Sequence, residues 1–426
     1  MKVLVLGSGG REHALAWKIK QSSSCSGLFC LPGNPGTAEI AHNLKGDLKD
    51  FESVKSAVID NNIEMVVVGP EDPLVNGLRD LFAADERLSS VLFVGPSAAG
   101  ARLEGSKDYA KEFMYRHSIP TAAYRTFNAD QIDEGKAFLK TLRPPYVLKA
   151  DGLAGGKGVV IPNTLKDAET ELEQMLGGKF GKAGNKVVIE EFLQGIEVSV
   201  FVLTDGKDYM ILPQAKDYKR ICDNDMGLNT GGMGAVSPVP FADDLFMSKV
   251  EERIIKPTVA GLKAEGIDYR GFIFIGLMNC GGDPYVIEYN VRMGDPETEA
   301  VMTRIDSDLL EHLKAAASGT LKDETIAISD KVALTVVCVS GGYPQQFVKG
   351  YKINLPDNVD ATVFHSGTAV KDGELVTSGG RVLAVTVNSE TIESARELIY
   401  PIVERIEYKD KFFRKDIGSD LLKYSR

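Results

Sequence analysis

The sequence predicts an α/β protein with a parallel sheet near its N-terminus. Two observations carry this prediction: apolar runs alternate with helix-length segments over the first hundred residues, and a glycine follows each run. The 426 residues correspond to about three domains of ~100–200 residues each. From about residue 120 the pattern changes to short strands around glycine-rich turns, and a further unit begins near residue 331.

The three N-terminal apolar runs are Lys2–Leu6, Glu64–Val68 and Val91–Val94. Near-continuous apolar strands of this kind are typical of a parallel sheet that is buried on both faces. Ligands of open α/β sheets bind beyond the carboxyl ends of the strands. The loops that follow these strands are therefore expected to point at one site.

The later segments predict a mixture of strands and helices. Gly271–Cys280 and Tyr285–Asn290, joined by Gly281-Gly282-Asp283, are typical of an antiparallel hairpin. The other expected strands are Tyr146–Ala150, Gly158–Ile161, Lys186–Leu193, Glu197–Thr204, Lys331–Ser340 and Arg381–Asn388, and the expected helices span 165–177, 242–265 and 391–406.

Composition limits the classes of function. The formal net charge of −11 argues against a protein that holds nucleic acid by neutralising phosphates. No apolar stretch reaches the ~20 residues of a membrane helix, and the N-terminal apolar run is too short for a signal peptide. The five cysteines lack the paired spacing of a zinc site. We therefore expect a cytoplasmic protein with neither a membrane nor a nucleic-acid partner.

The first chemical motif is the loop Gly7–His13, which follows a strand and opens a helix. Backbone amides at a helix N-terminus bind anions, and Arg11 adds positive charge. A dinucleotide fingerprint is not favoured, because its third glycine would fall at Glu12 and Leu28–Pro35 holds no acidic ribose ligand. A loop for a phosphate or small ligand is the preferred interpretation, with a plain tight turn as the alternative. His13 lies beside this loop, within reach of such a ligand.

A second motif spans residues 148–159, with the sequence LKADGLAGGKGV. It differs from a Walker A loop at Asp151, where glycine would stand, and at Gly158, where serine or threonine would stand. Glycines still let the backbone approach phosphate oxygens, and Lys149 and Lys157 supply positive charge. The pattern predicts a phosphate clamp, and a glycine-rich hairpin with a solvated lysine is the alternative.

Three further segments carry chemistry. Val187–Leu193 is suited to an adenine-binding edge, although an ordinary edge strand has the same pattern. Glu288 and Asn290 share one face of a strand because side chains alternate, and two oxygen ligands suit Mg²⁺. Arg292 comes next on that face and is suited to stabilising a phosphoryl group. The segment 217–235 mixes cations with glycines. This composition is typical of a loop that closes over a charged substrate, and a solvated surface loop is the alternative.

In this order, the motifs resemble the ATP-grasp superfamily and, more closely, the phosphoribosylamine–glycine ligases of purine biosynthesis. The resemblance is essentially full-length. Small departures are Tyr218 and Met293, where His and Phe are expected, and Leu228, where Pro is usual. They affect substrate geometry and not the reaction class. The motifs are GSGGREH (7–13), GPEDPL (69–74), GPS (95–97), GSK (105–107), LKADGLAGGKGV (148–159), VIEEFL (188–193), DYKR (217–220), NTGGMGA (229–235) and IEYNVRMGDPETE (287–299).

The resemblance implies an ATP-dependent carbon–nitrogen ligase. ATP phosphorylates the carboxylate of glycine, and the amine of 5-phosphoribosylamine attacks the glycyl phosphate to give glycinamide ribonucleotide, ADP and phosphate. Mg²⁺ or Mn²⁺ and a monomeric state are expected. The implied domains are an N-terminal α/β substrate domain (1–103), a linker and start of the ATP-grasp core (104–122), a nucleotide-clamping lobe (123–193), a metal and catalytic lobe (194–328) and a small C-terminal α/β domain (329–426).

The resemblance also assigns roles to residues. Nucleotide binding falls to Lys107, Lys149, Gly152, Gly155, Gly156, Lys157, Gly158, Glu190, Glu191, Leu193 and Glu197, and metal binding to Glu288 and Asn290. Substrate binding falls to Gly9, Gly10, Arg11, Glu12, Pro70, Glu71, Asp72, Asp217, Lys219, Arg220, Asn229, Thr230, Gly231, Gly232 and Arg292. Catalysis falls to Arg292, Lys149 and Asp295.

Three alternatives stay open at this stage. Another ATP-grasp carboxylate–amine ligase or a carboxylase would share the nucleotide clamp, but NTGGMGA and GDPETE argue against it. A nucleotide sensor without turnover would not need the Glu288, Asn290 and Arg292 set. An oxidoreductase using NAD is weakened by Glu12.

Overall fold

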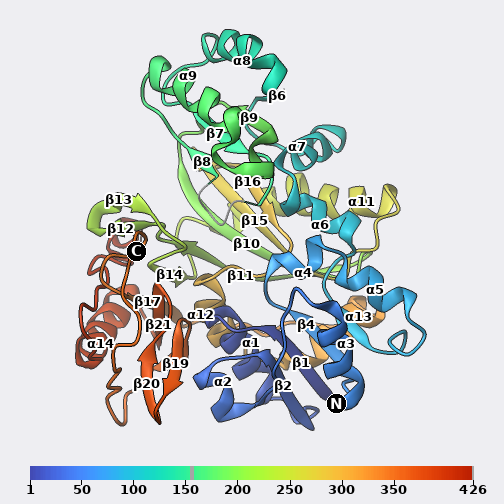
Figure 1. Cartoon of the computed structure of the whole chain (residues 1–426), viewed down its shortest axis with the longest axis vertical. Coiled ribbons are helices and arrows are strands. Elements are labelled where there is room, and N and C mark those ends of the chain that lie inside the picture. Colours follow the sequence, from blue (N-terminus) through green and yellow to red (C-terminus); the bar gives the residue numbers. More distant parts are fainter. Residues whose placement is uncertain (154–157, 425–426) are drawn as a thin grey trace.

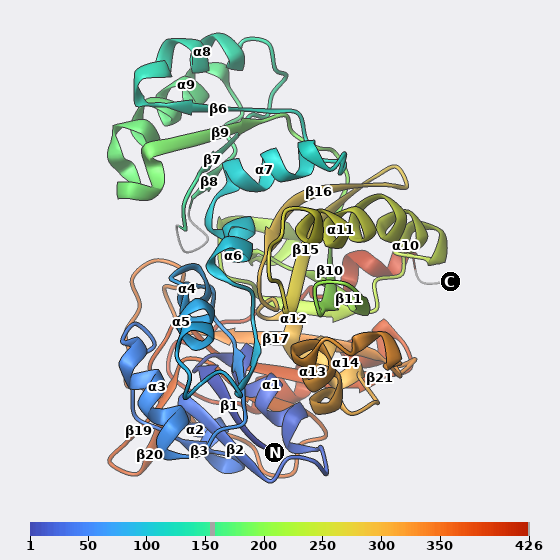
Figure 2. The ribbon, with the colours of Figure 1, turned by 90° about the vertical axis from the view of Figure 1, so that its right-hand side faces the viewer.

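A computed structural model of the chain describes residues 1–153 and 158–424. The N-terminal domain and the C-terminal domain lie side by side in the lower part of the view, and a smaller lobe projects at the top (Figures 1 and 2). A large sheet runs through the centre of the molecule and continues into the C-terminal domain. This is the mixed α/β architecture that the sequence predicts.

The N-terminal domain is a five-stranded parallel sheet in the order β3-β2-β1-β4-β5. Val3 and Val5 pack into one hydrophobic cluster, and Leu4 and Leu6 pack into another, so the strand is apolar throughout because both its faces are buried. The predicted parallel sheet is confirmed. Its elements are β1 (Lys2–Gly7), α1 (Gly10–Lys20), β2 (Gly27–Pro32), α2 (Pro35–Ile40), β3 (His42–Asn43), α3 (Phe51–Asp60), β4 (Met65–Val68), α4 (Glu71–Val75), α5 (Leu78–Ala84) and β5 (Leu92–Val94).

Two helices lead from this domain to the projecting lobe, α6 (Ala98–Gly105) and α7 (Lys107–Arg116). The lobe is a four-stranded antiparallel sheet in the order β6-β9-β7-β8, and its two helices pack together against it. Phe127, Leu148 and Leu172 belong to a core that is separate from the rest of the molecule. The elements are β6 (Tyr124–Asn128), α8 (Ile132–Leu139), β7 (Val147–Ala150), β8 (Val159–Val160), α9 (Leu165–Gln174) and β9 (Lys186–Glu190).

An eight-stranded antiparallel sheet forms the centre, in the order β16-β15-β10-β11-β14-β17-β21-β18. The predicted hairpin is confirmed, since β15 and β16 pair with Cys280 opposite Asp283. The elements up to residue 318 are β10 (Ile196–Thr204), β11 (Tyr209–Asp217), β12 (Arg220–Cys222), β13 (Met226–Asn229), β14 (Gly234–Ser237), α10 (Asp244–Val250), α11 (Lys256–Ala264), β15 (Gly271–Cys280), β16 (Asp283–Asn290), α12 (Glu297–Val301) and α13 (Leu309–Ser318).

The C-terminal domain continues this same sheet. Its first strand pairs with β14, so that Ala235 lies opposite Thr335, and α14 packs on β17 and β21. The remaining elements are β17 (Val332–Val339), β18 (Thr362–His365), β19 (Thr368–Lys371), β20 (Glu374–Thr377), β21 (Arg381–Ser389) and α14 (Ile392–Arg405). Among the described residues, no helix combines the length and the hydropathy that crossing a bilayer requires.

Candidate active site

The end of β16 places three predicted residues together. Glu288 lies opposite Gly276 and Asn290 lies opposite Phe274 in an unbroken register, so both side chains project from one face. Tyr289 between them is buried on the other face, where its hydroxyl meets Thr258. Because of this alternation, the two side chains that the sequence predicts as metal ligands project to the same side of the sheet.

Arg292 connects this strand to the N-terminal domain. One of its terminal nitrogens donates to Asn290 Oδ1 at 3.1 Å and to Glu104 Oε1 at 3.0 Å. Its Nε donates to Glu71 Oε2 at 3.3 Å, at the start of α4. Burial would raise the pKa of Glu71, but the guanidinium groups of Arg292 and Arg11 outweigh it and lower this pKa. The predicted metal end and the predicted substrate domain therefore meet at one side chain.

Glu104 was not foreseen from the sequence. It sits near the end of α6, directly before the GSK motif, and its other carboxylate oxygen accepts from the Val291 amide at 2.8 Å. Burial raises its pKa despite the opposing charge of Arg292. Its position next to a recognised motif was the only signal in the sequence.

The oxygen ligands suit a hard divalent cation. Glu288 and Asn290 supply a carboxylate and an amide oxygen, and phosphate and water oxygens would complete a Mg²⁺ shell. Within the described residues, no three His, Cys, Asp or Glu side chains are grouped as a metal site. A two-ligand site that relies on nucleotide phosphates is therefore the arrangement these residues fit.

Two lysines of the predicted nucleotide clamp lie in or beside the projecting lobe. Lys149 on β7 is buried, and its ammonium lies 3.0 Å from Glu190 Oε2 and donates to the Ile287 carbonyl at 3.0 Å. Lys107 at the start of α7 donates to the Gly152 carbonyl at 3.2 Å. Burial lowers the pKa of Lys107, and Glu288 opposes this effect.

The phosphate loop is only partly described. Gly155, Gly156 and Lys157 lie outside the described residues. Gly158 is buried, and its carbonyl accepts from the Ala150 amide at 2.8 Å, which closes the base of the loop.

Beyond β9 the chain turns away from the sheet. The strand ends at Glu190, and not at Leu193 as predicted, because the Ala123 amide beyond it bonds to the Glu191 side chain instead of a backbone carbonyl of the strand. Glu191 is exposed and its carboxylate accepts from the Ala123 amide at 2.9 Å. Leu193 is half-buried in the following segment.

Lys219, Glu197 and Asp217 form a cluster of one ammonium and two carboxylates. Lys219 is 2.5 Å from Glu197 and 3.9 Å from Asp217. Burial acts against the charge of Lys219, but Asp217 and Glu197 outweigh it and raise its pKa well above the usual value. Glu288 contributes to this field and also to that at Lys107. The charge of Glu288, a predicted metal ligand, therefore acts on both Lys107 and Lys219.

The first glycine loop forms the N-terminus of α1. Glu12 Oε2 accepts from the Gly9 amide at 2.6 Å, and Glu12 Oε1 accepts from Arg11 Nε at 2.8 Å. A Cβ on Gly69 would lie 2.1 Å from Glu12 Oε1, so the loop after β4 must carry glycine there. Arg11 also donates to the Met293 carbonyl at 3.1 Å. The Arg11 guanidinium is therefore paired and hydrogen-bonded within the protein.

The neighbouring loops of this domain differ in position. Pro70 precedes α4 and is half-buried, whereas Asp72 is exposed. The loop after β5 is bonded to the central domain, where the Gly95 amide donates to the Arg270 carbonyl at 2.7 Å. The loops after β1 and β4 therefore meet around Glu12, and the loop after β5 serves the contact between domains.

The C-terminal domain reaches into the same region, which the sequence did not indicate. Arg381 at the start of β21 forms a 3.1 Å ion pair with Asp295 Oδ1 and donates to the carbonyls of Asp295 and Gly231, each at 2.6 Å. The Gly231 amide donates to the Tyr343 hydroxyl at 2.9 Å. Two C-terminal side chains therefore hold the loop between β13 and β14.

The rest of that loop is bonded locally. Thr230 donates to the Lys219 carbonyl at 2.8 Å and accepts from the Gly232 amide at 2.9 Å, while Asn229 is exposed. Arg220 donates to the Gly227 carbonyl at 2.8 Å, within the hairpin of β12 and β13.

Two of the residues that depart from the family pattern point away from the site. Tyr218 is buried and donates to Asp420 at 2.6 Å, and Met293 lies in a hydrophobic cluster.

Two buried acids follow Asp295. Glu297 accepts from Ser199 at 3.1 Å, and burial together with Asp217 raises its pKa to about 7. Glu299 is fully buried, and neither of its oxygens has a hydrogen-bond partner among the described residues. Burial and the charge of Asp295 raise the pKa of Glu299 well above the usual value.

His13 does not face the site as expected. It lies on α1 and is buried, and its Nδ1 accepts from the amide of His365, the last residue of β18, at 2.9 Å. Its ring packs edge-on against Phe364 at 5.5 Å between centroids.

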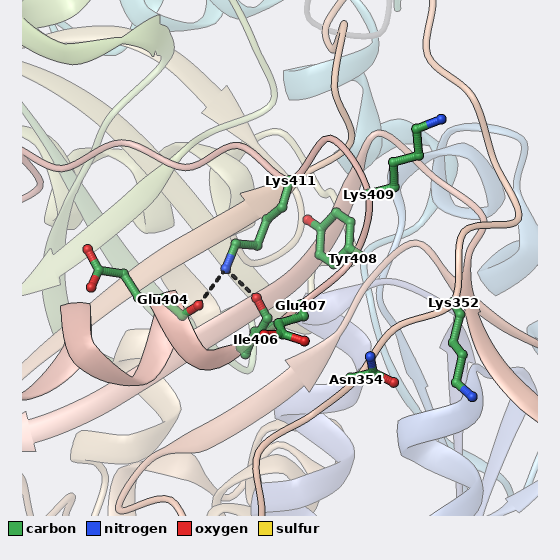
Figure 3. Close-up of a pocket in the computed structure, with 8 residues that line it drawn as sticks. All are labelled: Lys352, Asn354, Glu404, Ile406, Glu407, Tyr408, Lys409 and Lys411. Atoms are coloured by element: carbon green, nitrogen blue, oxygen red, sulfur yellow. Dashed lines mark hydrogen bonds between the residues drawn. The ribbon is translucent and has the colours of Figure 1, made fainter.

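A hollow of about 400 Å³ lies elsewhere, on the C-terminal domain (Figure 3). Lys411 points into it and donates to the carbonyls of Val403, at 2.7 Å, and Glu404, at 3.2 Å, near the end of α14. This ammonium satisfies free carbonyls at a helix C-terminus. None of the predicted site residues lines the hollow, so it has no part in the site.

Family models match almost all of the chain in the same order. The N domain of phosphoribosylglycinamide synthetase matches residues 1–104, its ATP-grasp (A) domain matches 105–298 and its C domain matches 333–420. The chain belongs to the phosphoribosylglycinamide synthetase family.

Named relatives agree with this assignment. The chain is 45% identical to a phosphoribosylamine–glycine ligase of Agrobacterium fabrum over 98% of both chains, and 44% identical to that of Escherichia coli K12 over 98% of both. The crystal structure of a phosphoribosylamine–glycine ligase from Thermotoga maritima superposes with a TM-score of 0.86 at 37% identity, over 98% of this chain and 100% of that one.

A more distant structure shares the fold alone. A Campylobacter jejuni biotin carboxylase solved with an ATP analogue has a TM-score of 0.71 at 16% identity, covering 96% of this chain and 92% of that one. Membership of the phosphoribosylglycinamide synthetase family makes this chain an ATP-dependent ligase of purine biosynthesis, and a carboxylase is not favoured.

Proposed function

We propose that the residues assembled around Arg292 join glycine to 5-phosphoribosylamine with ATP. The observation that carries this proposal is the position of Arg292, which bonds to Asn290 at the metal end and to Glu71 and Glu104 of the N-terminal part. The phosphoryl donor and the amine acceptor would thus be presented from opposite sides of one guanidinium. The reaction requires this proximity, because the acyl phosphate must be attacked where it forms.

The nucleotide would lie between the projecting lobe and the central sheet. Lys107 and Lys149 would contact its phosphates, together with the loop that includes Gly152 and Gly158. Glu190, Glu191, Leu193 and Glu197 would hold adenine and ribose. A divalent cation, Mg²⁺ or Mn²⁺, on Glu288 and Asn290 would neutralise charge on the transferred phosphoryl group.

The chemistry needs no protein nucleophile. The carboxylate of glycine attacks the γ-phosphorus of ATP and ADP leaves; the amine then attacks the acyl carbon of glycyl phosphate and phosphate leaves. The residues contribute position and charge stabilisation, with Arg292 facing the phosphoryl group. The α1 loop and the segment from Asp295 to Glu299 would enclose the two small substrates.

The decisive experiment measures ADP release with MgATP, glycine and phosphoribosylamine formed in situ from ribose 5-phosphate and ammonia. Each component is omitted in turn, and Glu288→Ala is compared with the exposed control Glu86→Ala. We expect release that needs both glycine and the amine, a fall of ~10²-fold or more in Glu288→Ala and no change in the control. Release that ignores glycine but responds to bicarbonate would exclude the proposed acceptor.

Three further predictions belong to this proposal. We expect a monomer, a cytoplasmic location, and domain limits near residues 103, 193 and 328. Sedimentation of the purified protein with MgADP tests the first of these.

A further inference from the structure

One buried cation beside the nucleotide clamp has no role in the mechanism above. Lys111 lies on α7 and its side chain is 2% exposed. Its ammonium donates to Thr121 Oγ1 at 2.7 Å and to the Ala122 carbonyl at 3.4 Å, and lies 3.2 Å from Glu190 Oε1. A lysine is seldom buried to this extent unless it is paired, so the position requires an explanation.

Its partner Glu190 is shared between two lysines. Oε1 faces Lys111, and Oε2 lies 3.0 Å from Lys149. Oε1 makes no hydrogen bond of good geometry among the described residues, so its contact with Lys111 is an ion pair alone. One carboxylate thus faces two ammonium groups, and the cluster carries an excess positive charge in a buried place.

The two lysines differ in their position relative to the phosphate loop. Lys149 stands next to the last residue of β7, directly before the phosphate loop. Lys111 is enclosed between α7 and the segment that enters β6, with the Tyr124 ring 5.5 Å from its ammonium. Its acceptor Thr121 is itself fixed, because the hydroxyl donates to the Val286 carbonyl at 2.7 Å. Lys149 is itself buried and bonded to the Ile287 carbonyl, but of the two lysines it is the one that adjoins the phosphate loop.

We infer that Lys111 is a positioning residue: it stays beside Glu190 as a counter-ion and holds that carboxylate in place, so that Lys149 can leave Glu190 for a nucleotide phosphate. This inference rests on the proposed nucleotide site. A phosphate that draws Lys149 away would otherwise strip a buried carboxylate of its last counter-ion. Lys111 stays behind and prevents that.

Removing the charge at position 111 has a specific consequence. In Lys111→Met, Glu190 is balanced by Lys149 alone, and nucleotide binding must either leave that pair intact or expose Glu190 as an unpaired buried anion. The carboxylate would then take up a proton as nucleotide binds. Burial lowers the pKa of Lys111 to about 8, with Glu190 opposing, so the wild-type residue is largely charged at neutral pH.

The test is calorimetric titration with MgADP, which needs no turnover. Wild type, Lys111→Met, Glu190→Gln and the double variant are compared at pH 6 and pH 7, where the wild-type lysine is charged, each in two buffers of different ionisation enthalpy. The exposed Lys166→Met in the same lobe is the matched control. For Lys111→Met we expect an affinity about 10–100-fold weaker, weaker still at the higher pH, and uptake of about one more proton than in wild type.

The double variant separates positioning from a structural role. Because Lys111 acts through Glu190, its replacement should change neither affinity nor proton uptake once Glu190→Gln is present. An equal loss in both backgrounds, or wild-type binding in Lys111→Met, would overturn the inference. If Lys111→Met does not fold but the double variant does, the charge is needed for Glu190 and the inference holds; failure of both to fold marks a purely structural lysine. Absence of MgADP binding in wild type would instead overturn the proposed function.

Discussion

At the scale of single residues, Arg292 carries the most connections in the site. Its planar guanidinium reaches Asn290, Glu71 and Glu104, which come from a strand and two helices. A lysine has one compact ammonium and cannot bridge acceptors in these separate directions. The geometry therefore depends on arginine itself and not only on its charge.

For Arg292→Lys we expect kcat to fall about 10²–10³-fold, because the charge is kept but its placement against the phosphoryl group is lost. The KM for ATP should change by less than about threefold, since the nucleotide contacts lie on other residues. Steady-state ADP release measures both. The control is Arg253→Lys, an exposed pair with Asp283. A kcat close to that of wild type would exclude a direct role for Arg292.

At the scale of elements, the loop between β13 and β14 shows how side chains from another domain fix a glycine-rich segment. Its glycines leave the backbone bare, and Arg381 and Tyr343 bind that backbone at Gly231. Arg381 also pairs with Asp295, which begins the turn into α12. One arginine from the C-terminal domain thus sets two loops of the central domain against each other.

Arg381→Met should separate substrate binding from nucleotide binding. We expect kcat/KM for glycine and for the amine to fall about 10–100-fold, because charge-assisted hydrogen bonds to two loops are lost. MgADP affinity should stay within about twofold, since none of these contacts belongs to the nucleotide clamp. Tyr343→Phe removes one hydrogen bond and should give a smaller loss in the same direction. A larger effect on MgADP binding than on the substrates would show that the loop serves the nucleotide.

At the scale of the whole molecule, the N-terminal and C-terminal domains meet around two buried histidines. Burial lowers the pKa of His13 to about 3, with His365 adding to the effect, and burial lowers that of His365 to about 4. Protonated His13 could not accept from the His365 amide. Both rings are therefore neutral in the folded protein over most of the acidic range.

This contact predicts acid sensitivity with a definite sign. Above the ordinary histidine pKa of about 6.5 both states are neutral and the contribution is fully present. Below it the unfolded chain binds protons that the folded chain refuses until about pH 4, so the unfolding free energy falls by up to about 1.4 kcal/mol per pH unit for each ring.

Urea unfolding between pH 4.5 and 6.5 measures the effect. In the double variant His13→Gln/His365→Asn, the unfolding free energy should fall less steeply with decreasing pH, by the equivalent of up to about two protons. The exposed variant His42→Gln should keep the wild-type dependence of the unfolding free energy on pH. Equal slopes for the double variant and wild type would show that these rings do not limit acid stability.

Prediction succeeded where a local pattern decides the structure. Strand periodicity placed Glu288 and Asn290 on one face, and the apolar runs placed the parallel sheet. It failed where distant segments meet. Nothing near Arg381, Tyr343 or Lys111 in the sequence indicates the loop or the carboxylate that each one contacts.

The element types, the order of the motifs and the family could all be predicted without coordinates, because they depend on residue spacing and on local hydrogen-bonding patterns. Tertiary structure alone decided which charges pair. Glu190 pairs with Lys111 and Lys149, Arg292 pairs with Glu71, and β17 extends the central sheet to bring Arg381 to Asp295. Such pairings between residues far apart in the sequence are set by how the domains pack, and that packing is a property of the whole folded chain.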